Sequence, residues 1–279
     1  MIKDIPTMLF SGEQSQPDTL FLVVEIGNTT TSLAVFRADE CLEVQKVPSL
    51  IMTGQEGIAE QIKPLVVSYP ALRDAVICSV VPLLDEAVSA ALRLHLAGEL
   101  LKVSASMKLP FTLHYDSPDT FGADRIALCA LSRHLYPGEA VIALDIGTAI
   151  TVDVLGSGQD YLGGLIMPGL DLMARALHEH TARLPLVAIG CPETLVGFST
   201  VDCIRNGITL GCVSSIDGLL VKIKNWLRKE HGEERIRVVA AGGNAQLVSA
   251  MLDSSPVVEE HAVLRGASYL FSLNRHSFR

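Results

Sequence analysis

The chain has 279 residues, of which 49% are hydrophobic and only 19% charged, so it has enough apolar residues for one large core or two smaller ones. A net charge of −9, with no cluster of Lys and Arg, argues against non-specific binding to nucleic acid or to an anionic membrane surface. No apolar run reaches about 18 residues, so the sequence predicts no membrane span.

Residues 1–20 are mixed and polar, and they lack the basic and then apolar pattern of a signal peptide. We expect them to form a short N-terminal extension before the first strand. The six cysteines include no C-x-x-C pair, and most of them lie in apolar segments. They are expected to be reduced and buried in a cytoplasmic protein, rather than to form a metal site or a disulfide framework.

The first half of the chain is predicted to contain three successive strands, followed by alternating helices and strands. Apolar runs bounded by turn residues predict the strands, and Pro82 suits the first turn of a helix. Strands are expected at Phe21–Ile26, Ser32–Arg37, Cys41–Val47, Ala75–Val81 and Leu100–Val103, and helices at Gly57–Val67, Leu83–Leu96 and Thr120–Leu135.

After the turn signal at residues 136–138 the same order begins again. The long helix of this half contains Gly207 and Gly211, which are expected to weaken or bend it. Strands are expected at Val141–Ile146, Thr151–Leu155, Tyr161–Leu165 and Val238–Ala241, and helices at Ser199–Leu227 and Asn244–Met251. The repeat predicts an α/β protein with two related halves, residues 21–138 and 139–279.

Each half opens on an apolar strand that ends in a carboxylate, followed by Ile-Gly and then by hydroxyl residues. The first copy starts at Glu25 and continues through Gly27, and the second starts at Asp145 and continues through Gly147. Both continue into a second strand, so they predict β-hairpin turns whose amides and hydroxyls can bind phosphate oxygens and whose acids can hold a cation. Two such turns indicate two halves that close on one nucleotide. Neither a Walker motif nor a strand followed by G-x-G-x-x-G occurs.

Asp124 and Arg125 stand side by side near the start of a predicted helix. Arg125 could bind a small carboxylate with two hydrogen bonds, and Asp124 could accept a proton from an attacking hydroxyl. The alternative is a helix-capping acid beside a surface arginine. Gly242 and Gly243 join a strand to a helix, where a ligand contact and a tight packing turn are equally compatible with the sequence.

This run of motifs resembles the type III pantothenate kinases, members of the acetate and sugar kinase/Hsp70/actin superfamily. The resemblance extends from about Phe21 to Phe271. In the family's order, D-x-G-N-T is similar to Glu25–Thr29, G-x-D-R to Gly122–Arg125, D-x-G-T-A to Asp145–Ala149, G-G-x-I-x-P-G to Gly163–Gly169, T-A-x-L-P to Thr181–Pro185, and the late glycine pair to Gly242-Gly243. The resemblance implies two ribonuclease-H-like halves with a nucleotide cleft between them. It also implies ATP-dependent phosphorylation of pantothenate, the first step of coenzyme A biosynthesis.

The resemblance further implies a role for each site residue. Asp124 would be the catalytic base, Asp145 would bind a monovalent cation (potassium or ammonium), and Glu25 is the candidate ligand for Mg²⁺. The residues implied to bind the nucleotide phosphates are Glu25, Gly27, Asn28, Thr29 and Thr148, and those implied to bind pantothenate are Tyr115, Gly122, Arg125 and Thr181, the last at a homodimer interface.

Several positions depart from the family pattern, above all Glu25, where the family has Asp. The extra methylene moves the carboxylate outward, and Mg²⁺ tolerates little geometric error. Two alternatives therefore remain beside an active kinase. One is a catalytically weakened subunit that binds or completes a partner kinase in a hetero-oligomer, and the other is a related kinase for another small acid. The active kinase is favoured because Asp124, Arg125 and Asp145 are intact.

Overall fold

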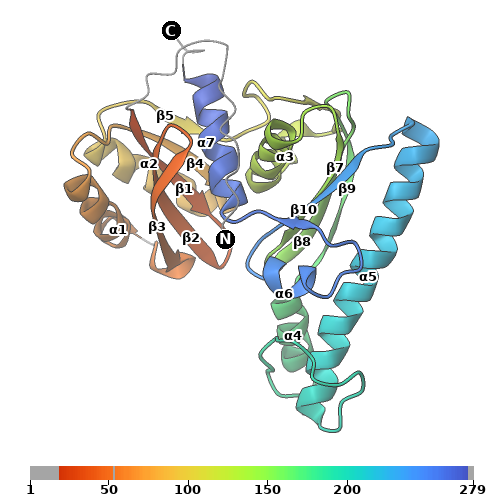
Figure 1. The fold of residues 1–279 in the computed structure, drawn as a ribbon. Coiled ribbons are helices and arrows are strands. Elements are labelled where there is room, and N and C mark those ends of the chain that lie inside the picture. Colours follow the sequence, from red (N-terminus) through yellow and green to blue (C-terminus); the bar gives the residue numbers. More distant parts are fainter. Residues whose placement is uncertain (1–18, 53, 276–279) are drawn as a thin grey trace, which may run out of the picture.

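The computed structural model describes residues 19–52 and 54–275. The chain first builds a sheet from strands that alternate with helices (Figure 1). Its elements are β1 (Leu20–Ile26), β2 (Thr30–Arg37), β3 (Glu40–Pro48), α1 (Gly54–Ser68), β4 (Asp74–Ser79), α2 (Pro82–His95) and β5 (Leu100–Lys102). The strand order is β3-β2-β1-β4-β5, in which β1, β2 and β3 are antiparallel and β4 and β5 run parallel to β1.

The remaining elements build a second sheet and its helices. They are β6 (Thr112–Leu113), α3 (Ala123–Leu135), β7 (Ala140–Ile146), β8 (Ala149–Leu155), β9 (Asp160–Pro168), α4 (Leu170–Glu179), α5 (Thr200–His231), β10 (Ile236–Ala241), α6 (Ala245–Ser249), β11 (Val257–Val258) and α7 (Ala262–Asn274). The strand order is β11-β10-β7-β8-β9-β6.

The two sheets repeat one topology. In the second sheet β7, β8 and β9 are antiparallel, and β10 and β11 continue the sheet parallel to β7. The order β9-β8-β7-β10-β11 therefore matches β3-β2-β1-β4-β5 strand for strand. The predicted α/β fold with two related ribonuclease-H-like halves is confirmed.

Strand β1 is apolar on both faces because helices cover the first sheet on both sides. Leu22 and Val24 belong to a core shared with α1 and α2, whereas Phe21 and Val23 face the other way, into a core shared with α3 and α7. A strand buried on both faces has a nearly continuous apolar sequence rather than an alternating one. The only break in the strand is Glu25, close to the edge where the functional residues gather.

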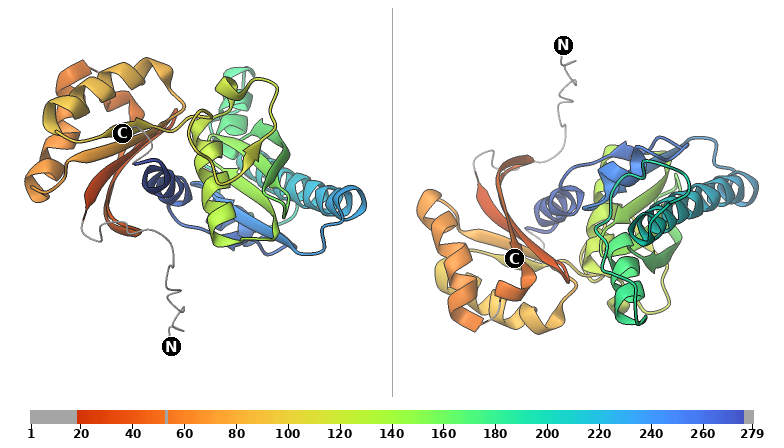
Figure 2. Two further views of the ribbon diagram at one scale, coloured as in Figure 1. Left: turned by 90° about the horizontal axis from the view of Figure 1, so that it is seen from above. Right: turned by 90° about the horizontal axis from the view of Figure 1, so that it is seen from below.

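Helices α3 and α7 lie between the two sheets (Figure 2). They pack against each other, α3 contacts β7 and β8, and α7 contacts β1 and β4. Short β6 also pairs with β9 of the second sheet. Elements from before residue 138 thus contact the second sheet, and α7 contacts the first. The division at residues 138/139 stays a prediction, and these elements link the two halves.

Helices α4 and α5 extend beyond the second sheet and form an arm, which we define as residues 170–231 (Figure 1). The Ser199 hydroxyl caps the start of α5 by accepting a hydrogen bond from the Asp202 amide at 3.1 Å. The helix runs unbroken through Gly207 and Gly211 and ends at Gly232, whose φ of 67° is the left-handed conformation that glycine favours.

Every predicted strand and helix is present, with shifted ends. Helix α3 begins at Ala123 rather than Thr120, because Pro118–Thr120 form a separate 3-10 turn and Gly122 is extended. The cysteines are free as predicted, but burial holds only for some of them, since Cys191 and Cys203 are exposed. Within residues 19–52 and 54–275, no helix is both long and apolar enough to cross a membrane. The predicted extension at residues 1–20 lies almost wholly outside the described residues.

Candidate active site

The two predicted hairpin turns meet across a cleft between the halves. In the first turn the Gly27 amide donates to the Thr30 carbonyl at 3.0 Å, and in the second the Gly147 amide donates to the Ala149 carbonyl at the same distance. The hydroxyls of Thr29 and Thr148 are hydrogen bonded to each other at 3.1 Å, although 119 residues separate them. Both turns line a cleft of about 1290 Å³, and Asn28 of the first turn is among the lining residues.

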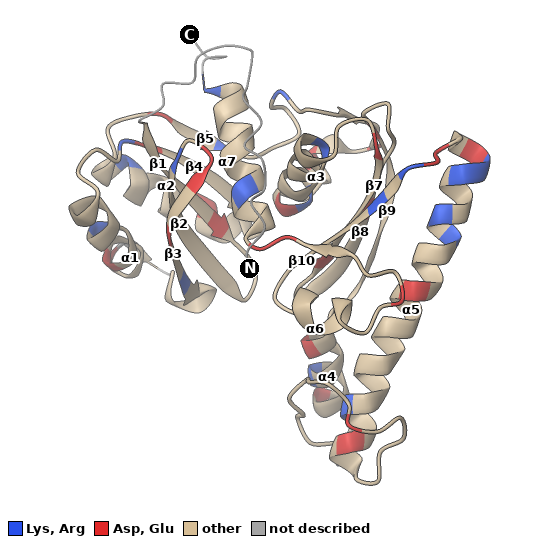
Figure 3. Ribbon diagram, viewed as in Figure 1, with Lys and Arg blue, Asp and Glu red and all other residues tan. Residues whose placement is uncertain are grey.

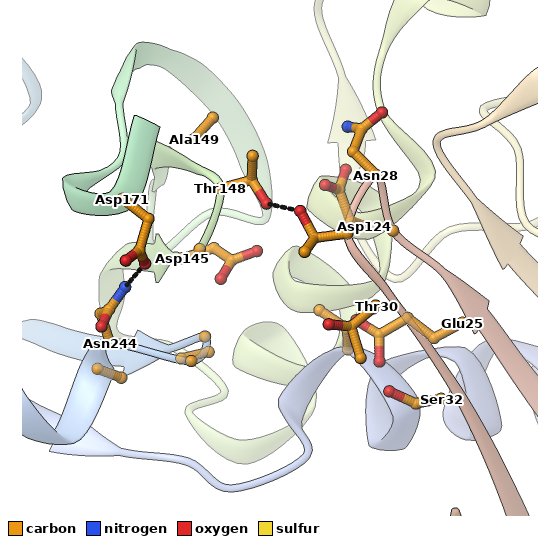
Figure 4. A pocket seen from close by; sticks show the side chains of 18 of the residues that line it. Glu25, Asn28, Thr30, Ser32, Asp124, Asp145, Thr148, Ala149, Asp171 and Asn244 are labelled. Atoms are coloured by element: carbon orange, nitrogen blue, oxygen red, sulfur yellow. Dashed lines mark hydrogen bonds between the residues drawn. The ribbon is translucent and has the colours of Figure 1, made fainter. Parts of the chain in front are cut away.

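Three of the carboxylates that line this cleft come from three different elements. Glu25 comes from β1, Asp124 from the first turn of α3, and Asp145 from β7 (Figure 4). Burial raises the pKa of each of them. For Asp145, the negative charges of Asp124 and Glu25 add to burial and bring the pKa to about 7. The cleft therefore concentrates negative charge that protons or cations must compensate.

The carboxylates of the cleft suit a cation that is also bound by a ligand or by water molecules. Among the described residues, no group of three or more His, Cys, Asp or Glu side chains is placed to enclose a metal ion. Mg²⁺ in phosphate-transfer sites is held by one or two carboxylates together with phosphate and water oxygens, so Glu25 and its neighbours suit that mode of binding rather than a closed protein cage. Lys46, on β3, also lines the cleft, and its charge lowers the pKa of Glu25 against the effect of burial.

Backbone from the second half completes the opposite wall of the cleft. Gly242 has a φ of 97°, and a Cβ there would overlap the Asp145 carboxylate and the backbone of Ile146. Next to it, the Asn244 amide donates to the Asp171 carboxylate on α4 at 3.2 Å (Figure 4). Gly242 is thus required for close packing on Asp145. It also lines the cleft, and its contact with a ligand stays a prediction.

Asp124 and Arg125 point to different partners although they are adjacent. The Asp124 carboxylate accepts a hydrogen bond from the Arg125 amide at 2.7 Å inside the first turn of α3, whose N-cap is Gly122. It also lines the cleft. A Cβ on Gly122 would lie 2.5 Å from this carboxylate, so glycine at that position makes room for it.

Arg125 is not the surface arginine of the alternative interpretation, because it is buried. Its Nη2 donates to Asp153 at 2.6 Å and to the Tyr161 hydroxyl at 2.8 Å. Tyr115, Phe121 and Tyr161 pack edge to face around it, and the guanidinium carbon lies 4.3 Å from the centre of the Phe121 ring. The structure thus brings Tyr115 and Arg125 together next to Gly122 and Asp124, and their predicted role in binding pantothenate stays a prediction.

Thr181 lies elsewhere. It lines a second, apolar hollow on the arm, where its hydroxyl donates to the Leu177 carbonyl at 2.7 Å. This hollow measures about 1020 Å³ and lies between α4, α5 and the segment that joins them. The structure therefore places Thr181 apart from the cleft of its own chain, and its predicted role stays a prediction that needs a second subunit.

Several residues of this region were not predicted from the sequence. Lys46, Asp171 and Asn244 line the cleft, and Asp153 and Tyr161 bind Arg125. Asn244 follows the glycine pair directly, which was an available signal. Asp153 was also visible as a lone acid inside an apolar strand, a pattern that indicates a buried partner.

Comparison with known proteins gives concordant matches. A family model described as type III pantothenate kinase matches residues 21–222. A type III pantothenate kinase of Chlorobium luteolum is 51% identical over 257 residues, covering 92% of this chain and 95% of the relative. The one of Chlorobium chlorochromatii is 47% identical over 259 residues, covering 92% and 97%.

A solved structure supports the fold. Component A of (R)-2-hydroxyglutaryl-CoA dehydratase from Acidaminococcus fermentans matches with a TM-score of 0.51 at 13% identity, covering 93% of this chain and 99% of that one. This likeness concerns the two-half architecture, whereas the sequence matches extend over the motifs of the cleft. The chain belongs to the type III pantothenate kinase family.

Proposed function

We propose that the protein transfers a phosphoryl group from ATP to the hydroxyl of pantothenate, giving 4'-phosphopantothenate in the first step of coenzyme A biosynthesis. The observation that carries the proposal is the position of Asp124, which lines a cleft between two hairpin turns that both offer amides and hydroxyls. Phosphoryl transfer needs positioning and charge compensation more than covalent chemistry, and this arrangement supplies both.

The residues divide between the two reactants. Gly27, Asn28, Thr29 and Thr148 would bind phosphate oxygens through turn amides and hydroxyls. Asp124 would accept the proton of the attacking hydroxyl, and its raised pKa makes it a better base than an exposed aspartate. Tyr115, Gly122 and Arg125 would hold pantothenate beside it.

The acids of the cleft suit two cations. Glu25 would hold Mg²⁺ together with phosphate oxygens, and when bound this ion neutralises charge on the transferred group. Asp145 would hold a monovalent cation, potassium or ammonium, since its buried carboxylate lies among other acids. Lys46 lies on the same side of the cleft as Glu25 and adds positive charge where phosphates would lie.

We also propose that the protein is a cytoplasmic homodimer. Its two subunits would contact each other through the arm, so that Thr181 lies next to the pantothenate bound by the partner subunit. Exposed apolar side chains on and next to the arm support this: Ile166, Leu186, Leu195, Val196 and Phe198. Residues 206–216 of α5 include no Lys, Arg, Asp or Glu, which leaves an uncharged stretch in the middle of the arm (Figure 3). A weakened subunit in a hetero-oligomer is not favoured, because relatives at 47–51% identity bear the name of the kinase itself.

The test is a coupled assay with pantothenate, ATP, Mg²⁺ and potassium. The protein should turn over, and Asp124→Asn should lower kcat by about 100-fold or more through loss of the base. Asp119→Asn is the matched control, because Asp119 is an exposed acid in the turn just before α3 and should leave kcat unchanged. Absence of turnover in the parent protein with every divalent and monovalent cation tried would overturn the proposal.

A further inference from the structure

Arg125 is held by two buried side chains, Asp153 and Tyr161, which lie outside the motif segments quoted from the sequence. Asp153, on β8, is completely buried, and its two carboxylate oxygens accept hydrogen bonds from Arg125 Nε at 3.1 and 3.2 Å. Arg125 Nη2 donates to the same carboxylate and to the Tyr161 hydroxyl, which in turn donates to Asp153 at 2.9 Å. The three side chains form a closed ring of hydrogen bonds.

The network fixes the charge of the arginine as well as its orientation. Burial alone would lower the pKa of Arg125, but the hydrogen bonds and charge of Asp153 outweigh burial, so the pKa is raised. The ring engages Nε and Nη2 but not Nη1, and the Tyr115 side chain also hydrogen bonds with the guanidinium. A guanidinium that already binds one carboxylate along its Nε and Nη2 edge can offer a second carboxylate only its Nη1 end, in contrast to the two-bond contact expected from the sequence.

The surrounding backbone leaves room for this ring and for little else. Gly164, on β9, lies directly against it, and a Cβ there would be 2.7 Å from both Arg125 Nη2 and the Tyr161 hydroxyl. On the other side, the Phe121 ring packs on the guanidinium. Arg125 therefore has a single supported orientation in this structure.

We infer that Asp153 and Tyr161 are positioning residues, which hold Arg125 so that its Nη1 end meets the carboxylate of the substrate and Asp124 remains unpaired as a base. The inference rests on the proposed function. Asp124 remains an effective base because Arg125, the residue that directly follows it on the helix, is paired elsewhere. An arginine paired with Asp124 would stabilise its charged form and weaken it as a base. In the structure Arg125 is instead paired with Asp153 on strand β8.

The test compares pantothenate with its neutral alcohol analogue, in which a CH₂OH group replaces the carboxylate. Initial rates give kcat/KM for both substrates, and their ratio reports recognition of the carboxylate alone. Asp153→Asn should lower this ratio at least 10-fold, mainly through KM for pantothenate, and Tyr161→Phe should lower it by about threefold. A role in stability alone would change both substrates equally and leave the ratio constant.

Asp160→Asn is the matched control, because Asp160 is next to Tyr161 in the chain but pairs with the exposed His114. The ratio for this variant should stay at the parent value. If Asp153→Asn does not fold, Tyr161→Phe decides, since it keeps the ion pair and removes one hydroxyl. An unchanged ratio in every folded variant of an active parent overturns the inference and leaves the proposed function standing. A parent protein that phosphorylates neither compound overturns both.

Discussion

Asp145 illustrates how burial sets the properties of a single side chain in the cleft. The pKa of its carboxyl group is about 7 in the folded protein, against an ordinary value of 3.8. Between about pH 4 and pH 7 the folded protein therefore keeps a proton on Asp145, whereas the unfolded chain has lost it. The stability that this proton contributes is fully present below the unfolded pKa of 3.8, and it is lost as the pH rises through the folded pKa of about 7. Above pH 7 the folded state therefore carries a buried charge at a cost.

We predict that Asp145→Asn raises the free energy of unfolding at pH 8, by about 4 kcal/mol at most, and that the gain shrinks towards zero near pH 4. Urea denaturation across this pH range measures it, in buffers without potassium, ammonium or Mg²⁺ so that no cation replaces the proton. Asp119→Asn, at an exposed position, should show no such pH dependence. A gain that is equal at all pH values would contradict the assignment to ionisation.

The same scale shows what the sequence could and could not predict about the site. Glu25 and Asp145 were found because each stands at the end of an apolar strand beside a glycine turn, a pattern contained in a few adjacent residues. The use of Arg125 was not predictable in this way, because its partner Asp153 lies 28 residues further along the chain on a different element. Only the folded arrangement shows that one edge of the guanidinium is occupied.

At the scale of elements, α3 and α7 depend on a glycine at their crossing. A Cβ added to Gly266 on α7 would overlap the carbonyl group of Ala127 on α3, so the two helices can approach this closely only with glycine there. These helices lie between the sheets and link the halves, so their spacing is part of the geometry of the cleft. Sequence patterns predicted α3 but not α7, since residues 262–274 are apolar on most sides and resemble a generic buried segment.

We predict that Gly266→Ala lowers the free energy of unfolding by about 2 to 3 kcal/mol, because the methyl group pushes two packed helices apart. Gly218→Ala is the matched control, as Gly218 lies at an exposed position of α5 where no atom is within 4 Å of the place that a Cβ would take, and alanine should stabilise that helix by about 0.5 to 1 kcal/mol. Chemical denaturation measures both changes. Destabilisation of the same size in both variants would mean that the helix crossing is not the cause.

At the scale of the whole molecule, the repeated topology was predictable and the relation of the halves was not. Two runs of three strands, each followed by alternating helices and strands, predict the repeat from local patterns alone. The crossing of β6, α3 and α7 between the halves depends on contacts far apart in the sequence, and so does the projection of the arm. The arm is also where Thr181 lies, which makes the assembly of two chains the decisive question at this scale.

We predict that the protein is a dimer and that Phe198→Asp shifts it to a monomer in sedimentation velocity at micromolar concentration. Phe198 is 92% exposed on the arm, and a charge in the centre of an apolar contact has no partner there. Leu83→Asp is the matched control, because Leu83 is 93% exposed on α2, in the other half of the molecule, and the dimer should persist. A parent protein that sediments as a monomer contradicts the prediction. If Thr181 serves the partner subunit's cleft, the monomeric variant should also lose turnover while its folded stability stays at the parent value, which separates assembly from unfolding as the cause.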